Sequence, residues 1–245
     1  MEYITSYYRQ QGGSGCSLLL LQFQCRQTPV CFACICTAAG ADGEKCCGDM
    51  AEKLKAWCRG VPWQKSVRRP CKGLENMEQE LTALQAAACG AASLRSGLRL
   101  TMLLCIGREV LSLGAGQNLL LINTSLGTGR ITPLPGTFRG CIEPGAGLLL
   151  ATDGLIENAG EESIGEVLRL SEIRTQEQAD RRLRELLRFR ELLTFRESVI
   201  SEGETAIRDQ AAVGKKTVKS REPDAAILLI GREGKAGVSR QQGKV

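Results

Sequence analysis

One acidic residue stands where an apolar run gives way to a glycine. Residues 145–158 begin on a Pro-Gly turn, continue through the apolar run 148–151, which predicts a buried strand, and reach Asp153 followed by Gly154. A carboxylate at a strand end, beside a glycine that lets the backbone turn sharply, has a geometry suited to metal binding. The alternative is an Asx-type turn that merely ends the strand, and the local pattern taken alone favours that turn.

The composition narrows the chemistry that this chain can perform. The sequence has no histidine among its 245 residues, which excludes Ser-His-Asp and Cys-His catalysis and histidine-bound zinc. Catalysis would therefore depend on carboxylates, metals, lysine, arginine or cysteine. A net charge of +5 with only 4% aromatic residues argues against nucleic acid, and no apolar run approaches the roughly 18 residues of a membrane span. We expect neither a nucleic-acid partner nor a membrane.

Twelve cysteines raise the question of disulfides or a metal site. Because the chain is long and lacks a signal peptide, we expect reduced, mostly buried thiols in a cytoplasmic protein. Cys31 and Cys34 lie in a predicted strand and so point to opposite faces, which prevents them from sharing a metal. The vicinal pair Cys46 and Cys47, in a predicted charged loop over 37–48, is the best candidate for a reactive thiol.

The hydrophobic pattern predicts a pair of strands, two helices, a strand meander, a helical insert and a final strand. Both strands of the first hairpin are continuously apolar, so we expect them to be central in a sheet. Segregated helices and strands indicate an α+β fold, with one domain over residues 1–231 and a basic flexible tail over 232–245. We expect the arginines of the helical insert to pair with acidic residues of the same insert. The predicted elements are strands 16–23 and 30–36, helices 49–58 and 74–88, strands 98–106, 110–113, 119–123 and 148–151, the arginine-rich helical insert at about 161–213, and strand 225–230.

Two stretches resemble the PP2C family of metal-dependent protein serine/threonine phosphatases. They are Glu-Pro-Gly before Leu-Leu-Leu-Ala-Thr-Asp-Gly-Leu, ending at Leu155, and Glu-Pro-Asp before Ala-Ala-Ile-Leu-Leu-Ile, ending at Ile230. The resemblance covers about residues 9–231 and implies two antiparallel sheets with helices on both outer faces. It also implies that Asp153 and Asp224 bind Mn or Mg as catalytic residues, and that Arg9 binds the substrate phosphate.

The departures from the family pattern fall on its metal ligands. The family has a bridging Asp-Gly where this chain has Thr37-Ala38, and an Asn where it has Ala225. No acidic residue occurs between Glu2 and Asp42, although the family has an acidic pair there. A threonine offers one neutral oxygen, and two divalent ions need several carboxylates to offset their charge.

Two hypotheses follow from this mixture of matches and departures. The first is a pseudophosphatase or regulatory binding module that binds Mn or Mg weakly or not at all and recognises a phosphoprotein or a protein kinase. The second is a weakly active Mn/Mg-dependent phosphatase in which Asp42, or Glu44, replaces a missing metal ligand and acts together with Asp153 and Asp224. The simpler interpretation of Asp42 and Glu44 is that they are solvated charges of a loop. Both hypotheses require Asp153 and Asp224 to meet at one rim of the sandwich beside Thr37.

Overall fold

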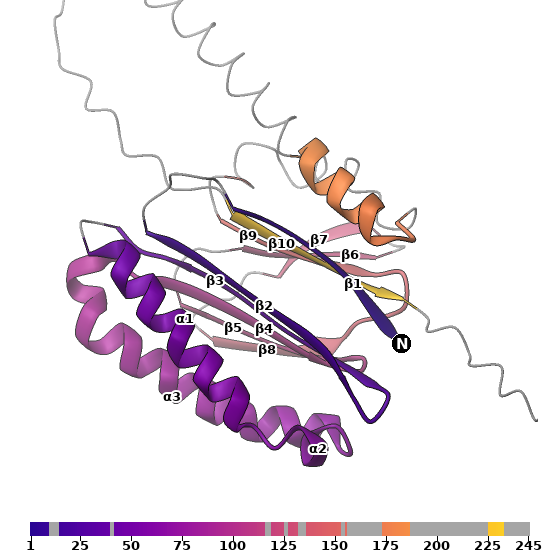
Figure 1. The fold of residues 1–245 in the computed structure, drawn as a ribbon, viewed down its shortest axis with the longest axis horizontal. Coiled ribbons are helices and arrows are strands. Elements are labelled where there is room, and N and C mark those ends of the chain that lie inside the picture. Colours follow the sequence, from indigo (N-terminus) through magenta and orange to yellow (C-terminus); the bar gives the residue numbers. More distant parts are fainter. Residues whose placement is uncertain are drawn as a thin grey trace, which may run out of the picture.

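Two five-stranded antiparallel sheets face each other in the part of the chain that the structure describes (Figure 1). The structure is a computed structural model. It describes residues 1–9, 15–39, 42–115, 119–124, 127–131, 136–152, 155, 173–186 and 225–232, with the side chains of 88–96 and 115–136 excepted.

The first sheet joins the two ends of the described chain. Its order is β1 (Glu2–Arg9), β10 (Ala225–Arg232), β9 (Gly147–Ala151), β6 (Leu119–Thr124) and β7 (Gly127–Ile131). The second sheet has the order β2 (Cys16–Cys25), β3 (Thr28–Thr37), β4 (Arg99–Ile106), β5 (Glu109–Ala115) and β8 (Gly136–Cys141). Every neighbouring pair is antiparallel.

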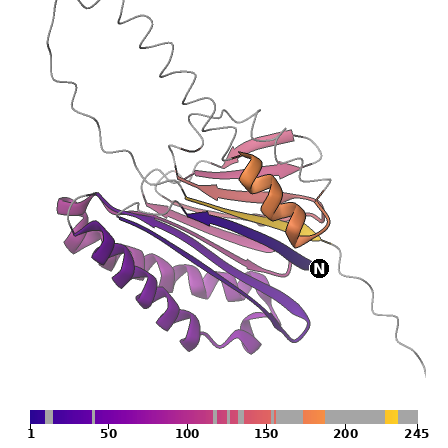
Figure 2. The same cartoon turned by 45° about the horizontal axis from the view of Figure 1, so that its top comes forward.

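Helices cover the outer face of each sheet. The second sheet carries α1 (Gly43–Gly60), α2 (Trp63–Ser66) and α3 (Pro70–Ser96), as Figure 1 shows. The first sheet carries a helix over residues 176–186, coloured orange in Figure 2. Leu183 and Leu186 of this helix are buried against Leu149 and Leu228 of the sheet. The expected α+β sandwich with helices on both outer faces is therefore confirmed.

The continuous apolar run of β3 is explained by burial on both of its faces. Phe32 and Cys34 pack against the helices, whereas Cys31 and Ile35 pack between the two sheets. Complete burial of one such side chain contributes roughly 1.5–3 kcal/mol. The prediction that Cys31 and Cys34 point to opposite faces is confirmed.

Three expectations about the second sheet and the helix α1 that covers it were wrong. Among the described strands β2 is an edge strand, and residues 21–25 at its end are only partly buried or exposed, because none of these strands covers its far side. The expected meander is split: after β5 the chain crosses to the first sheet for β6 and β7 and returns for β8. α1 begins at Gly43, so the segment expected to be a loop up to residue 48 is partly helical.

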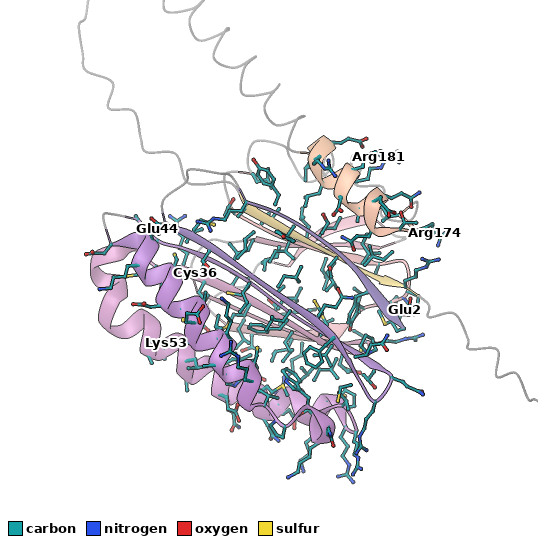
Figure 3. All side chains as sticks on the ribbon, viewed as in Figure 1. Glu2, Cys36, Glu44, Lys53, Arg174 and Arg181 are labelled. Carbon is teal, nitrogen blue, oxygen red and sulfur yellow. The ribbon has the colours of Figure 1, made fainter. Side chains whose placement is uncertain are left out.

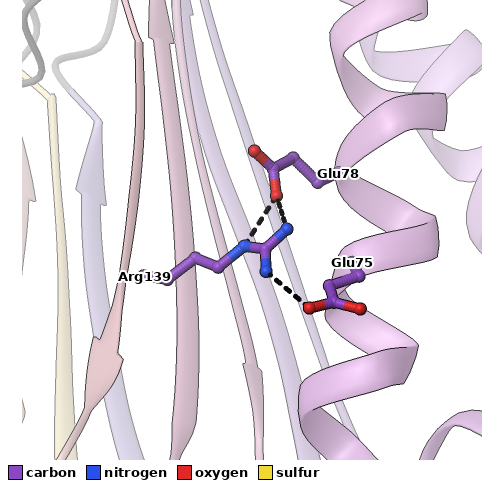
Figure 4. Close-up of polar contacts among 3 residues, drawn as sticks. All are labelled: Glu75, Glu78 and Arg139. Carbon is purple, nitrogen blue, oxygen red and sulfur yellow. Dashed lines mark hydrogen bonds and ion pairs between the residues drawn. The ribbon is translucent and has the colours of Figure 1, made fainter.

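A surface cluster links the edge strand β8 to α3. The guanidinium of Arg139 donates through Nε to Glu78 at 2.7 Å and through Nη1 to Glu75 at 3.2 Å (Figure 4). These side chains are 21–55% exposed, and exposed ion pairs contribute little to stability. The cluster mainly fixes where the two carboxylates point.

The helix 176–186 shows the charge pairing expected of the insert. Arg182 lies 2.9 Å from Glu185, and Arg181 lies 4.0 Å from the same carboxylate. Ser6 of β1 donates to Asp180 at 2.6 Å, which ties the helix to the sheet edge. The rest of the predicted insert 161–213 and residues 233–245 of the predicted tail lie outside the described residues.

The described cysteines form no disulfide with one another, and seven of these eleven are buried. Of the helices that the structure describes, none combines the length and the apolar character that crossing a membrane requires.

Candidate active-site rim

The ends of three strands of the first sheet meet at one rim. Arg9, the last residue of β1, is paired with Ala225, the first residue of β10. Beyond β9, the backbone N–H of Thr152 donates to the carbonyl of Ala225 at 3.0 Å. The N–H of Ala225 in turn donates to the hydroxyl of Thr152 at 3.2 Å, and both residues are buried. The two segments, 73 residues apart in sequence, are therefore locked together.

This contact brings together the backbone positions beside the two predicted metal ligands. Asp153 follows Thr152 directly, and Asp224 precedes Ala225 directly. Both aspartates lie outside the described residues. Their metal-binding and catalytic roles therefore stay predictions, while the strand ends that carry them are neighbours.

The second sheet contributes the ends of β2 and β3 to the same rim. Cys16 pairs with Thr37, and the N–H of Ala38 donates to the carbonyl of Gly15 at 2.7 Å. Gly15 has a φ of +82°, and a Cβ placed on it would lie 2.1 Å from the carbonyl oxygen of Ala38. Only glycine allows the two backbones to approach this closely.

The core places the two sets of strand ends together. Cys16 packs in the same buried cluster as Ala225 and Leu150 of the first sheet. Burial raises the pKa of Cys16 to about 11, and the nearby guanidinium of Arg9 opposes that rise. Arg9 thus stands at the rim with Cys16 and its paired residue Thr37, although its role in binding phosphate stays a prediction.

Thr37 is the residue that the sequence resemblance places at the family's bridging-aspartate position. It is 4% exposed, and its hydroxyl has no hydrogen-bond partner among the described residues. A buried polar group left unpaired costs about 1–3 kcal/mol. The rim therefore holds a buried, neutral oxygen where the resemblance calls for a charged carboxylate.

Asp42 and Glu44, the possible replacement ligands, are both exposed at the start of α1. The carbonyl of Asp42 accepts the N–H of Cys46 at 3.0 Å, and its carboxylate makes no capping hydrogen bond. Figure 3 shows Glu44 at the same end of the molecule as Cys36. Within the described residues, no group of three or more Cys, Asp or Glu side chains has an arrangement that would hold a metal.

A buried pair of thiols that the sequence pattern did not predict lies beneath the rim. Cys36 donates to Cys47 across an Sγ–Sγ distance of 3.4 Å, and Cys47 donates to the carbonyl of Gly15 at 3.3 Å. The hydrogen bond from Cys36 lowers the pKa of Cys47, with a smaller contribution in the same direction from Arg9. Cys46 and Cys47 lie in α1 rather than in a loop, and Cys47 is buried, so the prediction of an accessible charged loop there was wrong.

The described donor set does not fit a two-metal centre. It consists of the hydroxyl of Thr37, several thiols and the exposed carboxylates of Asp42 and Glu44. Mg and Mn sites need several converging carboxylate oxygens, and the described residues contain no such group. Glu2, the acidic residue of β1, pairs with Arg232 at the end of the strand remote from Arg9.

Sequence comparison gives no family assignment, since no protein-family model and no curated protein matches the chain. Solved structures do match. PppA, a regulatory component of the type VI secretion system (T6SS) of Pseudomonas aeruginosa, has a TM-score of 0.58 at 14% identity, covering 94% of this chain and 98% of that one. A bacterial serine phosphatase has a TM-score of 0.60 at 12% identity, with the same coverage. The catalytic domain of PstP, a serine/threonine phosphatase solved with two manganese ions, has a TM-score of 0.54 at 13% identity, covering 94% and 100%.

These similarities establish the architecture of the chain. The structures it resembles are PP2C-type serine/threonine phosphatases, and this chain has their fold. At 10–14% identity the likeness concerns the fold alone, and function has to be argued from the site.

Proposed function

We propose that this protein is a pseudophosphatase: a PP2C-fold domain that binds a phosphorylated partner without hydrolysing it. The observation that carries the proposal is Thr37, whose buried hydroxyl stands unpaired among the described residues at the position of the family's bridging aspartate.

The charges around Thr37 support this proposal. Two divalent ions held roughly 3.5–4 Å apart need several carboxylates. Residues 15–39, which form β2 and β3 and the rim next to them, contain no Asp or Glu at all. Asp153 and Asp224 alone would hold one hard cation loosely, with water completing its coordination. We therefore expect the rim to bind Mn or Mg only with low affinity.

Arg9 provides the rim with a means of binding phosphate. It is exposed at the end of β1, and a guanidinium can donate two parallel hydrogen bonds to a phosphate group. This geometry suits a phosphoserine or phosphothreonine on a partner protein, such as a phosphoprotein or a protein kinase.

The enzymatic test uses the full chain with millimolar Mn, an aryl phosphate and a phosphopeptide. We expect no turnover by the wild type above that of Asp153→Asn, with both proteins folded by circular dichroism. Mn-dependent turnover that Asp153→Asn and Asp224→Asn abolish would establish the weakly active phosphatase instead. Asp42→Asn would then show whether Asp42 serves as the replacement ligand.

The binding test compares Arg9→Ala with Arg108→Ala. Arg108 is an equally exposed arginine in the turn between β4 and β5, where it lies 3.9 Å from Glu143. We expect Arg9→Ala to weaken binding of a phosphopeptide at the rim about tenfold, as loss of one charge-assisted contact predicts, and Arg108→Ala to leave it unchanged. Equal effects of the two substitutions would refute a role for the rim.

A further inference from the structure

A group of exposed, positively charged residues lies at the end of the molecule remote from the rim. Between Glu52 and Glu75 the sequence has seven lysines and arginines and no acidic residue. The structure gathers five of them, all exposed, around α2: Arg59, Lys65, Arg68, Arg69 and Lys72. At the β2–β3 turn, opposite the strand ends that form the rim, Arg26 contacts Gln64 of α2 at 3.4 Å (Figure 1).

Three of these cations line one pocket, which we call the α2 pocket. It has a volume of about 220 Å³ and lies between α2 and the first turns of α3. Lys65, Arg69 and Lys72 line it together with the polar side chains of Ser66 and Asn76. The apolar side chains of two buried residues, Val61 and Met77, complete the wall.

A glycine makes this pocket possible. The N–H of Gly73 donates to the carbonyl of Arg69 at 2.8 Å. A Cβ placed on Gly73 would lie 2.9 Å from the carbonyl oxygen of Ser66 and 3.0 Å from its Cα. The first turn of α3 therefore packs directly on α2, and this contact fixes the three cations around one space.

The acidic residues closest in sequence have other partners. Glu75 and Glu78 bind Arg139, as Figure 4 shows. Glu80, the one acidic residue in the wall of the α2 pocket, accepts the indole N–H of Trp57 at 2.7 Å. No carboxylate of the described residues forms an ion pair with the lysines or the arginine of the pocket. With three cations and one carboxylate in its wall, the pocket has a net positive charge.

We propose that the α2 pocket binds the phosphate group of a phosphorylated segment of a partner protein. Its volume falls below the roughly 300–1,000 Å³ of sites for drug-sized ligands, and so fits a phosphoryl group rather than a whole nucleotide. Three cations and the side-chain amide of Asn76 match the oxygens and the charge of a phosphate monoester. Arg59 and Arg68, exposed beside the pocket, would contact acidic residues flanking the phosphate.

The surroundings of the pocket argue against two other anionic ligands. Trp57 and Trp63 pack edge to face against each other, and each also packs against a phenylalanine, Phe32 or Phe23. Their rings are thus engaged in packing rather than arranged as a platform for stacking bases. A membrane surface would call for large apolar side chains around the cations. Among the described residues the large exposed apolar side chain is Tyr7 of β1, on the other sheet.

The test measures the affinity of the full-length protein for a phosphoserine peptide flanked by glutamates, by fluorescence anisotropy. We expect the double variant Lys65→Ala/Arg69→Ala to bind the peptide at least tenfold more weakly, and the unphosphorylated peptide to bind the wild type at least tenfold more weakly. Lys53→Ala is the matched control, since Lys53 is an exposed cation of α1 outside the pocket. We expect a change below twofold. An unchanged unfolding midpoint shows that the variants are folded.

Four outcomes would overturn the proposal. In the first, the double variant binds the phosphopeptide as tightly as the wild type does; in the second, it loses no more affinity than Lys53→Ala does. In the third and fourth, the wild type binds single-stranded RNA, or phosphatidylserine vesicles, more tightly than it binds the phosphopeptide. Arg9→Ala separates this pocket from the rim. Loss of binding in Arg9→Ala alone assigns the phosphate to the rim and refutes the pocket, whereas loss in the double variant alone supports the pocket and refutes binding at the rim.

Discussion

The two ends of this sandwich differ in where their charge lies. At the rim, strand ends converge on buried residues without charge: Thr37, Cys16 and the thiol pair Cys36 and Cys47. Arg9 is the charged side chain that the described structure adds there from β1. At the α2 end, the buried residues are equally apolar, but the surface carries a group of cations without carboxylate partners.

This contrast separates what the fold of the chain supplies from what its side chains supply. Contacts such as those of Gly15 and Thr152 hold the strand ends of the rim together within a fold that PP2C-type structures share. Residues 15–39, which include the strand that carries Thr37, contain no Asp or Glu. The fold therefore predicts where a site belongs, and the side chains decide whether the site works.

The largest effect should come from breaking the backbone contact of the rim. Gly15→Ala puts a Cβ 2.1 Å from the carbonyl oxygen of Ala38 at a residue whose φ is +82°. We expect a loss of about 3–5 kcal/mol in the free energy of unfolding, from left-handed backbone strain and overpacking together. Urea unfolding measures it.

Gly145→Ala is the matched control for this substitution. Gly145 has a similar φ of +86°, but no atom lies within 4 Å of an added Cβ. We expect only the cost of strain, about 1–2 kcal/mol. Equal losses for the two variants would mean that the rim contact has no special role.

The next effect compares buried thiols at the two ends. Burial raises the pKa of Cys58, near α2, to about 12, and that of Cys16, at the rim, to about 11. Above pH ~8.5 these thiols ionise in the unfolded chain but stay protonated in the folded one, so stability falls as the pH rises. We expect a loss of about 1.4 kcal/mol per thiol per pH unit up to pH ~11. Urea unfolding between pH 8 and 10 tests this. Cys58→Ala should reduce the slope, and a flat profile would show that these thiols are not dry.

A smaller effect concerns the helix contact at the α2 end. Gly73→Ala forces a Cβ to 2.9 Å from the carbonyl oxygen of Ser66, which we expect to cost about 1–3 kcal/mol. Gly48→Ala is the control, because Gly48 is exposed in α1 with no atom within 4 Å of an added Cβ. That variant should gain about 0.5–1 kcal/mol from helix propensity. Chemical denaturation of both variants decides; a gain in both would mean that α3 does not pack tightly on α2.

The smallest effect compares two buried threonines of the rim. Thr37→Val removes a hydroxyl that has no partner among the described residues, so we expect a gain of up to about 1 kcal/mol. Thr152→Val removes the acceptor of the N–H of Ala225, and we expect a loss of about 1–3 kcal/mol. Thermal unfolding at one pH compares them. A loss in Thr37→Val as large as in Thr152→Val would show that the hydroxyl of Thr37 has a partner.

The sequence predicted the elements with strong apolar patterns and missed the weak ones. β3, β4 and β10 are continuous apolar runs and were found. β7 and β8 each include two glycines, which weaken a strand pattern, and β1 has few aliphatic residues. α1 was predicted to begin too late because Gly43 and Gly48 are poor helix formers at its start.

The sequence predicted the candidate sites only in part, for a different reason. The absence of carboxylates from residues 15–39 is visible in the sequence, because it concerns residue types along one segment. The Cys36–Cys47 contact and the α2 pocket depend on how α1 and α3 pack, which local patterns do not specify. The basic residues of segment 59–72 are plain in the sequence, but their arrangement around a pocket follows from the Gly73 contact.

Calorimetric titration of Mn into the wild-type protein tests the central claim most directly. A rim without the bridging carboxylate should bind no Mn with micromolar affinity, and Asp153→Asn should give the same trace as the wild type. Two ions bound per chain at micromolar affinity, with that binding lost in Asp153→Asn, would show that the metal centre is intact and would contradict the assignment as a pseudophosphatase.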